Sequence, residues 1–118
     1  VDEVTDRLAF RRDWLAKEGI RPAQALLVRV RGDSMLPTLH DGDLVLIDRA
    51  RTEGSKGRVY ALVDVSGDTR VKRCERPDRA TLVLRSDNPA HPLELRRGPD
   101  LDRLRIIGEV RWSGHTWR

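Results

Sequence analysis

The sequence is poor in the residues that build disulfides, metal sites and membrane spans. Its single cysteine, Cys74, cannot form an intrachain disulfide or a cysteine-based metal site. Such cysteine usage is typical of a reducing cytoplasm. No apolar run approaches the roughly 18 residues that a membrane-spanning helix needs, and the acidic start Val1-Asp2-Glu3 is not a signal peptide. We therefore expect a cytoplasmic protein with no membrane contact, cofactor or metal.

Aromatic residues and basic runs are also scarce. Aromatic residues make up 4% of the chain, so the core must be built from Val, Leu and Ile. The net charge of +4 permits contact with nucleic acid. However, no run of five or six basic residues occurs, and many arginines adjoin acidic residues, as in Arg12-Asp13 and Glu75-Arg76. This pattern favours a solvated surface over a direct DNA-binding face.

The 118 residues fit one domain, which we place at 1–118. The sequence does not begin with methionine, so we expect a fragment or a processed product with a further domain upstream. A helix is predicted over about Asp6 to Glu18, because apolar residues recur there at helical spacing. Gly19 provides its stop, with Pro22 just beyond.

Short strands are predicted over the rest of the chain. Each is an apolar or β-branched run bounded by turn residues. Their ranges are Leu26–Val30, Asp43–Asp48, Arg58–Val65, Thr69–Cys74, Thr81–Arg85, Leu93–Leu95 and Arg105–Trp112. Ser66-Gly67-Asp68 predicts a hairpin turn, while Asp87-Asn88-Pro89 and Arg97-Gly98-Pro99 are interpreted as loops. The expected fold is mostly β with one N-terminal helix.

Residues 32–43, Gly-Asp-Ser-Met-Leu-Pro-Thr-Leu-His-Asp-Gly-Asp, form the most unusual segment. Gly32 permits a sharp turn after a strand, and Pro37 stiffens the exit. Ser34 would thus be held on a rigid loop, where backbone N–H groups can stabilise an oxyanion. A serine in such a turn is, however, more often an ordinary turn residue.

Two familiar serine-hydrolase arrangements receive no support. The Gly-x-Ser-x-Gly elbow is absent, since position 36 is leucine. None of the three histidines, which are His40, His91 and His115, has an acidic partner that sequence spacing identifies, although sequence order cannot exclude a triad.

The segments Gly32–Met35, Pro37–Leu39 and Asp41–Leu46 together resemble the nucleophile signature of the LexA and signal peptidase superfamily. Arg70-Val71-Lys72-Arg73, on the second strand of a hairpin, resembles that family's lysine segment, and Lys72 follows Ser34 by 38 positions, close to the family interval. The resemblance extends over nearly the whole chain.

The resemblance implies a fold of short coiled sheets in which Ser34 is the nucleophile and Lys72 the general base. It also implies the C-terminal domain of a LexA-like or prophage-type repressor. Such a domain forms a homodimer, contacts DNA through a helix-turn-helix domain missing here, and cleaves its own chain in the SOS response or in prophage control. A RecA filament would serve as co-protease.

Lys72 can act as a base only if its pKa falls well below about 10.4. Burial can lower a lysine pKa by roughly 3–5 units, and a nearby Arg70 would add to this. Strand alternation argues the other way: if Val71 faces the core, Lys72 faces outward with Arg70 and Cys74, as an ordinary exposed lysine. The family interval favours the buried base.

The bond to be cut is not visible in the sequence. LexA-like proteins cleave between a small residue and glycine, and the glycines before Ser34 follow Glu18 and Arg31, which do not fit. The family interval places the bond at or just before Val1. Three interpretations stay open: an autopeptidase, a non-cleaving dimerisation module with an idle Ser34 and Lys72, and a soluble relative of signal peptidase that acts on other chains and would normally need a membrane anchor.

Overall fold

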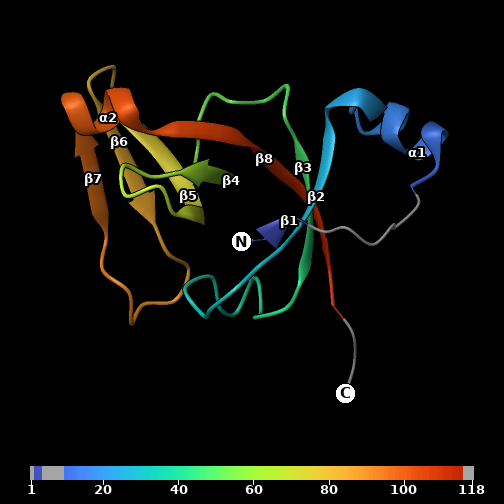
Figure 1. The fold of residues 1–118 in the computed structure, drawn as a ribbon, viewed down its shortest axis with the longest axis horizontal. Helices are drawn as coiled ribbons and strands as arrows, with labels where there is room; N and C mark the ends of the chain where they lie inside the picture. Colours follow the sequence, from blue (N-terminus) through green and yellow to red (C-terminus); the bar gives the residue numbers. More distant parts are fainter. Residues whose placement is uncertain (1, 4–9, 116–118) are drawn as a thin grey trace.

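The computed structural model describes residues 2–3 and 10–115 as one strongly coiled antiparallel sheet with short helices (Figure 1). The strand order is β1-β2-β3-β8-β4-β5-β6-β7. The strands are β1 (Asp2–Glu3), β2 (Ala25–Arg29), β3 (Leu44–Asp48), β4 (Arg58–Val63), β5 (Thr69–Asp78), β6 (Thr81–Arg85), β7 (Glu94–Arg97) and β8 (Arg105–Gly114). The mostly-β prediction is confirmed, and in the described residues no helix is long and apolar enough to span a membrane.

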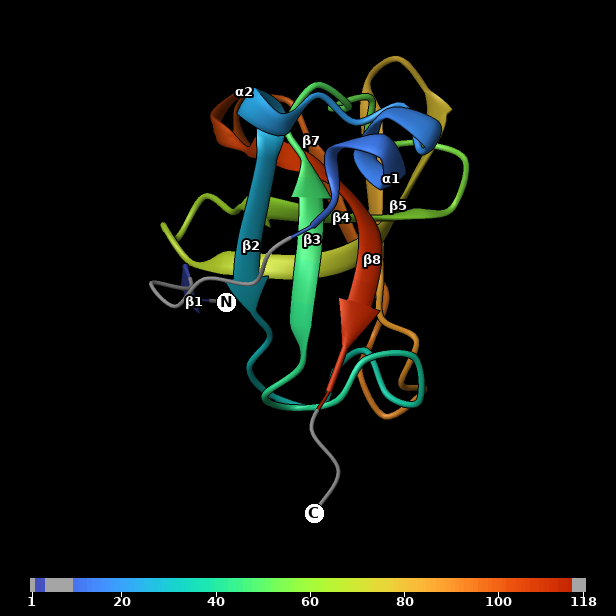
Figure 2. The same cartoon turned by 90° about the vertical axis from the view of Figure 1, so that its right-hand side faces the viewer.

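β8 joins the two halves of the sheet. It pairs with β4 near its start and with β3 further along, and a register shift interrupts each pairing. Such irregularities bend a strand and increase its twist. As a result β2, β3 and β8 stand side by side, while β4 and β5 run across behind them (Figure 2). Gly108 lies at this crossing, where a Cβ atom would come within 2.3 Å of the Asp48 carbonyl oxygen.

The predicted helix is shorter than the sequence pattern suggested. α1 spans Arg12–Lys17, and Arg11 before it has an extended backbone. The predicted positions 6–9 lie outside the described residues. Gly19 ends the helix as predicted: at a φ of +72° its N–H donates to the Ala16 carbonyl, as a left-handed C-terminal stop requires.

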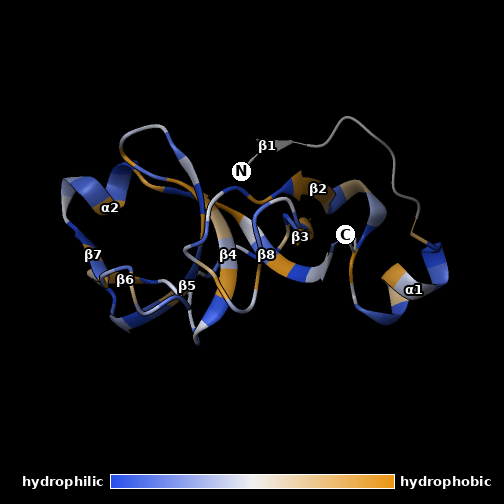
Figure 3. Cartoon of the chain, turned by 90° about the horizontal axis from the view of Figure 1, so that it is seen from below, coloured by the Kyte–Doolittle hydropathy of each residue, from blue (hydrophilic) through white to orange (hydrophobic). Residues whose placement is uncertain are grey.

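A second helix begins at the end of the predicted loop Arg97-Gly98-Pro99. α2 spans Pro99–Arg103, so the expectation of a single helix is wrong. Pro99 has its φ preset for the first helical turn, and Leu101 packs against a core cluster, which together explain the short helix. A 3₁₀ turn, Pro22–Gln24, precedes β2. The helices α1 and α2 lie at opposite ends of the molecule (Figure 3).

Of the three apolar core clusters in the described residues, two lie against β5. One, between the two halves of the sheet, includes Met35 and Leu39 from the serine segment and Val71 from β5. A second cluster includes Cys74 of β5 and underlies α2. Because β5 contributes to both clusters, apolar side chains bury both of its faces.

Candidate active site

Ser34 lies in a loop that the core and the backbone hold in place. The N–H of Gly42 donates to the Val30 carbonyl at 2.8 Å, which closes the base of the loop. The N–H of Gly32, whose φ is +85°, donates to Asp41 Oδ1 at 2.8 Å. Met35 packs into the core, where it is 1% exposed. These contacts make the serine loop a rigid platform, as the sequence led us to expect.

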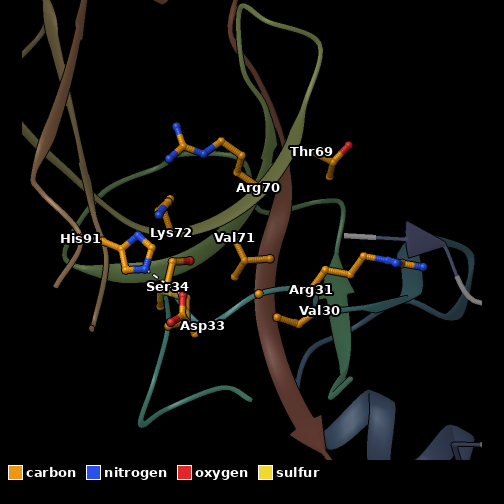
Figure 4. A pocket seen from close by; sticks show the side chains of 11 residues that line it. Val30, Arg31, Asp33, Ser34, Thr69, Arg70, Val71, Lys72 and His91 are labelled. Carbon is orange, nitrogen blue, oxygen red and sulfur yellow. Dashed lines mark hydrogen bonds and ion pairs between the residues drawn. The ribbon is translucent and has the colours of Figure 1, made fainter. Parts of the chain in front are cut away.

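Lys72 lies across a cleft from this loop. The side chain is 3% exposed, so the outward, exposed position that simple alternation predicts is wrong. Simple alternation assumes that one face of the strand is exposed to solvent, whereas both faces of β5 pack against apolar clusters. Ser34 and Lys72 both line a cleft of about 260 Å³ between the serine loop and β5 (Figure 4). The structure therefore brings the two predicted site residues together.

The surroundings of Lys72 favour its neutral form. Burial lowers the lysine pKa most, the positive charge of Arg70 lowers it further, and Glu94 partly opposes both. The Lys72 Nζ atom donates a hydrogen bond to Ser86 Oγ at 2.5 Å. This bond holds the amine on the cleft side of β5, beside the serine loop.

The loop between β6 and β7 completes the site. The sequence predicted part of this loop but not its contribution to the site. The loop begins with Ser86, directly after β6. Asn88 follows, with its N–H donating to the Ser34 carbonyl and its side-chain amide donating to the Asp33 carbonyl, both at 3.0 Å. The sequence marked residues 87–89 only as a loop, because nothing in their spacing indicates which segment they contact.

Asp87 ties the serine loop to the lysine strand. Arg73, the residue after Lys72, donates to both carboxylate oxygens of Asp87 at 2.7 and 3.1 Å. Thr38 of the serine loop donates to the same carboxylate. Burial alone would raise the pKa of Asp87, but the hydrogen bonds from Arg73 and Thr38 outweigh it and lower the pKa. The carboxylate thus helps to set the distance between the two sides of the cleft.

His91 is the one histidine that lines the cleft. Its Nε2 atom lies 2.8 Å from Asp33 Oδ1 (Figure 4). The sequence alone could neither predict nor exclude such a histidine–aspartate pair near Ser34. His40 and His115 stack on each other instead, with ring centroids 5.6 Å apart. Of the described residues, no group of three or more His, Cys, Asp or Glu could hold a metal ion.

Comparisons with known proteins agree with this architecture. The family model described as Peptidase S24-like matches residues 1–111. The chain is 32% identical over 113 residues to the HTH-type transcriptional regulator PrtR of Pseudomonas aeruginosa, with 95% of the chain and 44% of the relative covered. It is 30% identical over 105 residues to an uncharacterized HTH-type transcriptional regulator of Haemophilus influenzae, with 88% and 43% covered. The chain therefore spans less than half the length of either relative.

Proposed function

Because this chain belongs to the Peptidase S24-like family, we propose that it is the C-terminal self-cleavage and dimerisation domain of a LexA-like or prophage-type repressor. The observation that carries the proposal is the shared cleft, in which Ser34 faces a buried Lys72 whose pKa is lowered. A neutral amine beside a serine hydroxyl is the combination that general-base activation of a nucleophile requires.

In the proposed reaction Ser34 Oγ attacks the carbonyl carbon of a peptide bond as its proton passes to Lys72 Nζ. The backbone N–H of Ser34 stabilises the oxyanion. The C–N bond then breaks, Lys72 returns the proton to the leaving amine, and an ester on Ser34 remains. Water, deprotonated by Lys72, hydrolyses this ester and restores the serine. The Ser86 hydroxyl keeps the lysine amine in place throughout.

The position of β1 supports an upstream segment of the same chain as the substrate. β1 pairs antiparallel with β2, with Asp2 opposite Arg29. Followed backwards from Asp2, a strand with this pairing leads toward Val30 and Arg31, which line the cleft. Residues that precede this segment in a longer chain would therefore approach the cleft beside Ser34.

The relatives named as helix-turn-helix transcriptional regulators support an upstream DNA-binding domain in the full-length protein and a cytoplasmic site of action. Dimerisation rests on the family resemblance. Cleavage between the two domains would separate the DNA-binding half from the half that pairs two chains, and would thereby release the repressor from its operator. A RecA filament on single-stranded DNA is the proposed co-protease.

The test uses the full-length protein, incubated from pH 7 to 10 with and without a RecA–single-stranded DNA filament. Gel electrophoresis and mass spectrometry identify the fragments. We expect two fragments from the wild type and none from Ser34→Ala or Lys72→Ala, while Ser66→Ala, which changes an exposed turn, cleaves normally. His91→Ala distinguishes the two bases near Ser34 and is expected to retain cleavage.

A wild type that stays intact under every condition would overturn the cleavage proposal. If that intact chain sediments as a dimer, the domain is a non-cleaving dimerisation module, and if it cuts other chains it is a free-standing peptidase. Cleavage that persists in Lys72→Ala but is lost in His91→Ala would assign the base to the histidine.

A further inference from the structure

Four charged side chains form a closed network next to Lys72. Arg70 donates to Asp64 Oδ2 at 2.9 Å and to the two oxygens of Glu94 at 3.0 and 2.5 Å. Arg96 donates to both oxygens of Asp64, at 3.0 and 2.7 Å, and to Glu94 at 3.1 Å. Each carboxylate therefore contacts both guanidinium groups. The network contains two positive and two negative charges.

The network holds Arg70 in one position. Asp64, 5% exposed, lies just after β4, while Glu94 lies on β7, so partners from two different segments fix the guanidinium group. Arg70 precedes Lys72 by two residues on β5, which places both on the same face of that strand. Both residues line the cleft that contains Ser34 (Figure 4). A flexible surface arginine would swing away from a neighbouring ammonium group, but this one is held by its partners.

Other ionisable groups also surround Lys72. Tyr60 of β4 stands opposite Lys72 in the sheet register, and burial is the main cause that raises the pKa of its phenol, which is therefore neutral near pH 7. Arg31, Asp33 and His91 also line the cleft, and the Arg73–Asp87 ion pair lies next to it. Among the charged groups, Arg70 lowers the pKa of Lys72 and Glu94 raises it, in addition to the larger lowering by burial.

We propose that Arg70, held by Asp64 and Glu94, is a positioning residue whose fixed positive charge keeps Lys72 a proton acceptor, while Glu94 limits that effect. The inference deepens the proposed function and rests on it for its catalytic meaning. Its physical basis is that a fixed cation disfavours protonation of a nearby buried amine, whereas a carboxylate favours it. The network thus adds to the larger effect of burial in setting how close to neutral pH the base becomes available.

The test follows the titration of Lys72 directly. The chain has three lysines, so selectively labelled lysine side chains yield three NMR signals, which Lys17→Arg and Lys56→Arg assign. We expect Arg70→Gln to raise the titration midpoint of Lys72 by about one pH unit, the order of effect that one neighbouring charge produces. Glu94→Gln should lower the midpoint, and Arg70→Lys, which keeps the positive charge, should leave it close to that of the wild type.

The opposite signs separate electrostatics from mere structural support. If the network served only to hold β7, breaking it from either side would shift the midpoint in the same direction. Arg85→Gln is the matched control, because it breaks an exposed Arg85–Glu75 pair of 3.0 Å on neighbouring strands of the same sheet. An unchanged midpoint in Arg70→Gln, or equal shifts in Arg70→Gln and Glu94→Gln, would overturn the inference.

The same variants in the full-length protein connect the titration to self-cleavage. At neutral pH the cleavage rate of Arg70→Gln should fall roughly tenfold for each pH unit by which the midpoint rises, because the neutral fraction of Lys72 falls by that factor. If the midpoints shift as expected but no variant or wild type cleaves, the proposed function fails and the electrostatic role stands. If the wild type cleaves and the midpoints do not shift, only the inference fails.

Discussion

Replacing Lys72 with methionine should alter the way in which the stability of this protein depends on pH. The lysine is 3% exposed, and burial, aided by Arg70 and opposed by Glu94, lowers its pKa in the folded chain. Methionine fills a similar space but binds no proton. The substitution therefore removes one linked protonation equilibrium while preserving most of the packing around β5.

The sign and size follow from the difference in protons bound. In the unfolded chain the lysine pKa is about 10.4. Between the lower folded pKa of Lys72 and this value, the unfolded state binds more protons, so the free energy of unfolding rises with pH, by up to about 1.4 kcal/mol per pH unit. At a pH below the folded pKa of Lys72, the buried ammonium group lowers the free energy of unfolding by its full amount. At a pH above the unfolded pKa of about 10.4 the lysine is neutral in both states, and this destabilisation is absent. Methionine removes this slope.

A second effect of the substitution does not depend on pH. The Ser86 hydroxyl loses its partner, which costs about 1–3 kcal/mol if no water replaces the amine. The absolute stability of the variant therefore combines two opposing changes. The slope against pH isolates the contribution of the lysine.

Urea unfolding of both proteins between pH 6 and 10.5 measures this slope. The advantage of Lys72→Met over the wild type should shrink as pH rises through the window between the two lysine pKa values. Lys17→Met, at an exposed position of α1, is the control and should run parallel to the wild type. Parallel curves for Lys72→Met and the wild type would show that Lys72 titrates as an ordinary lysine, and would refute the reasoning.

Three further substitutions test the surroundings of the cleft. Ser86→Ala should slow self-cleavage about fivefold with an unchanged circular dichroism spectrum, because the lost hydrogen bond from a neutral amine is worth roughly 1 kcal/mol; a normal rate would deny Ser86 a role in holding the amine. When urea unfolding is repeated below about pH 4, the free energy of unfolding should fall less for Asp87→Asn than for the wild type. The pKa of Asp87 is lowered in the folded protein, so its ionised carboxylate stabilises the wild type near neutral pH, and this stabilisation is lost as pH falls. Equal acid sensitivity of the two proteins would contradict this. Gly108→Ala should lower stability by about 2 kcal/mol or more and Tm by several degrees, because its Cβ would meet a backbone oxygen at 2.3 Å, and an unchanged Tm would show that β8 can move away.

The sequence predicted the bounds of a helix or strand correctly where the residues of that element alone determine them. β6 has the predicted bounds Thr81–Arg85, and Gly19 ends α1 as expected. The extent of β5 was underestimated, because the strand continues beyond Cys74 to Asp78 through pairing with β6 that no local pattern reveals. The predicted strand Leu93–Leu95 is displaced to Glu94–Arg97 for the same reason, since it is an edge strand whose register β6 determines.

Some residues of the candidate site could be identified from the sequence, and others could not. Ser34 and Lys72 could be selected from the sequence because their segments resemble a known signature at a known interval. Ser86, Asn88 and the partners of Arg70 could not, since each is brought to the cleft by strands that are distant in sequence.

What the sequence determined by itself is therefore the serine loop, the mostly-β character and the selection of Ser34 and Lys72 as candidate site residues. Glycine, proline and the alternation of apolar residues act over a few neighbouring positions and leave a readable pattern. Only the tertiary structure decided that Lys72 is buried, because the apolar cluster around Cys74, with Leu101 of α2 packed against it, lies on the face of β5 that alternation assigns to solvent. That burial, aided by the charge of Arg70 and opposed by that of Glu94, makes an ordinary strand lysine a candidate base.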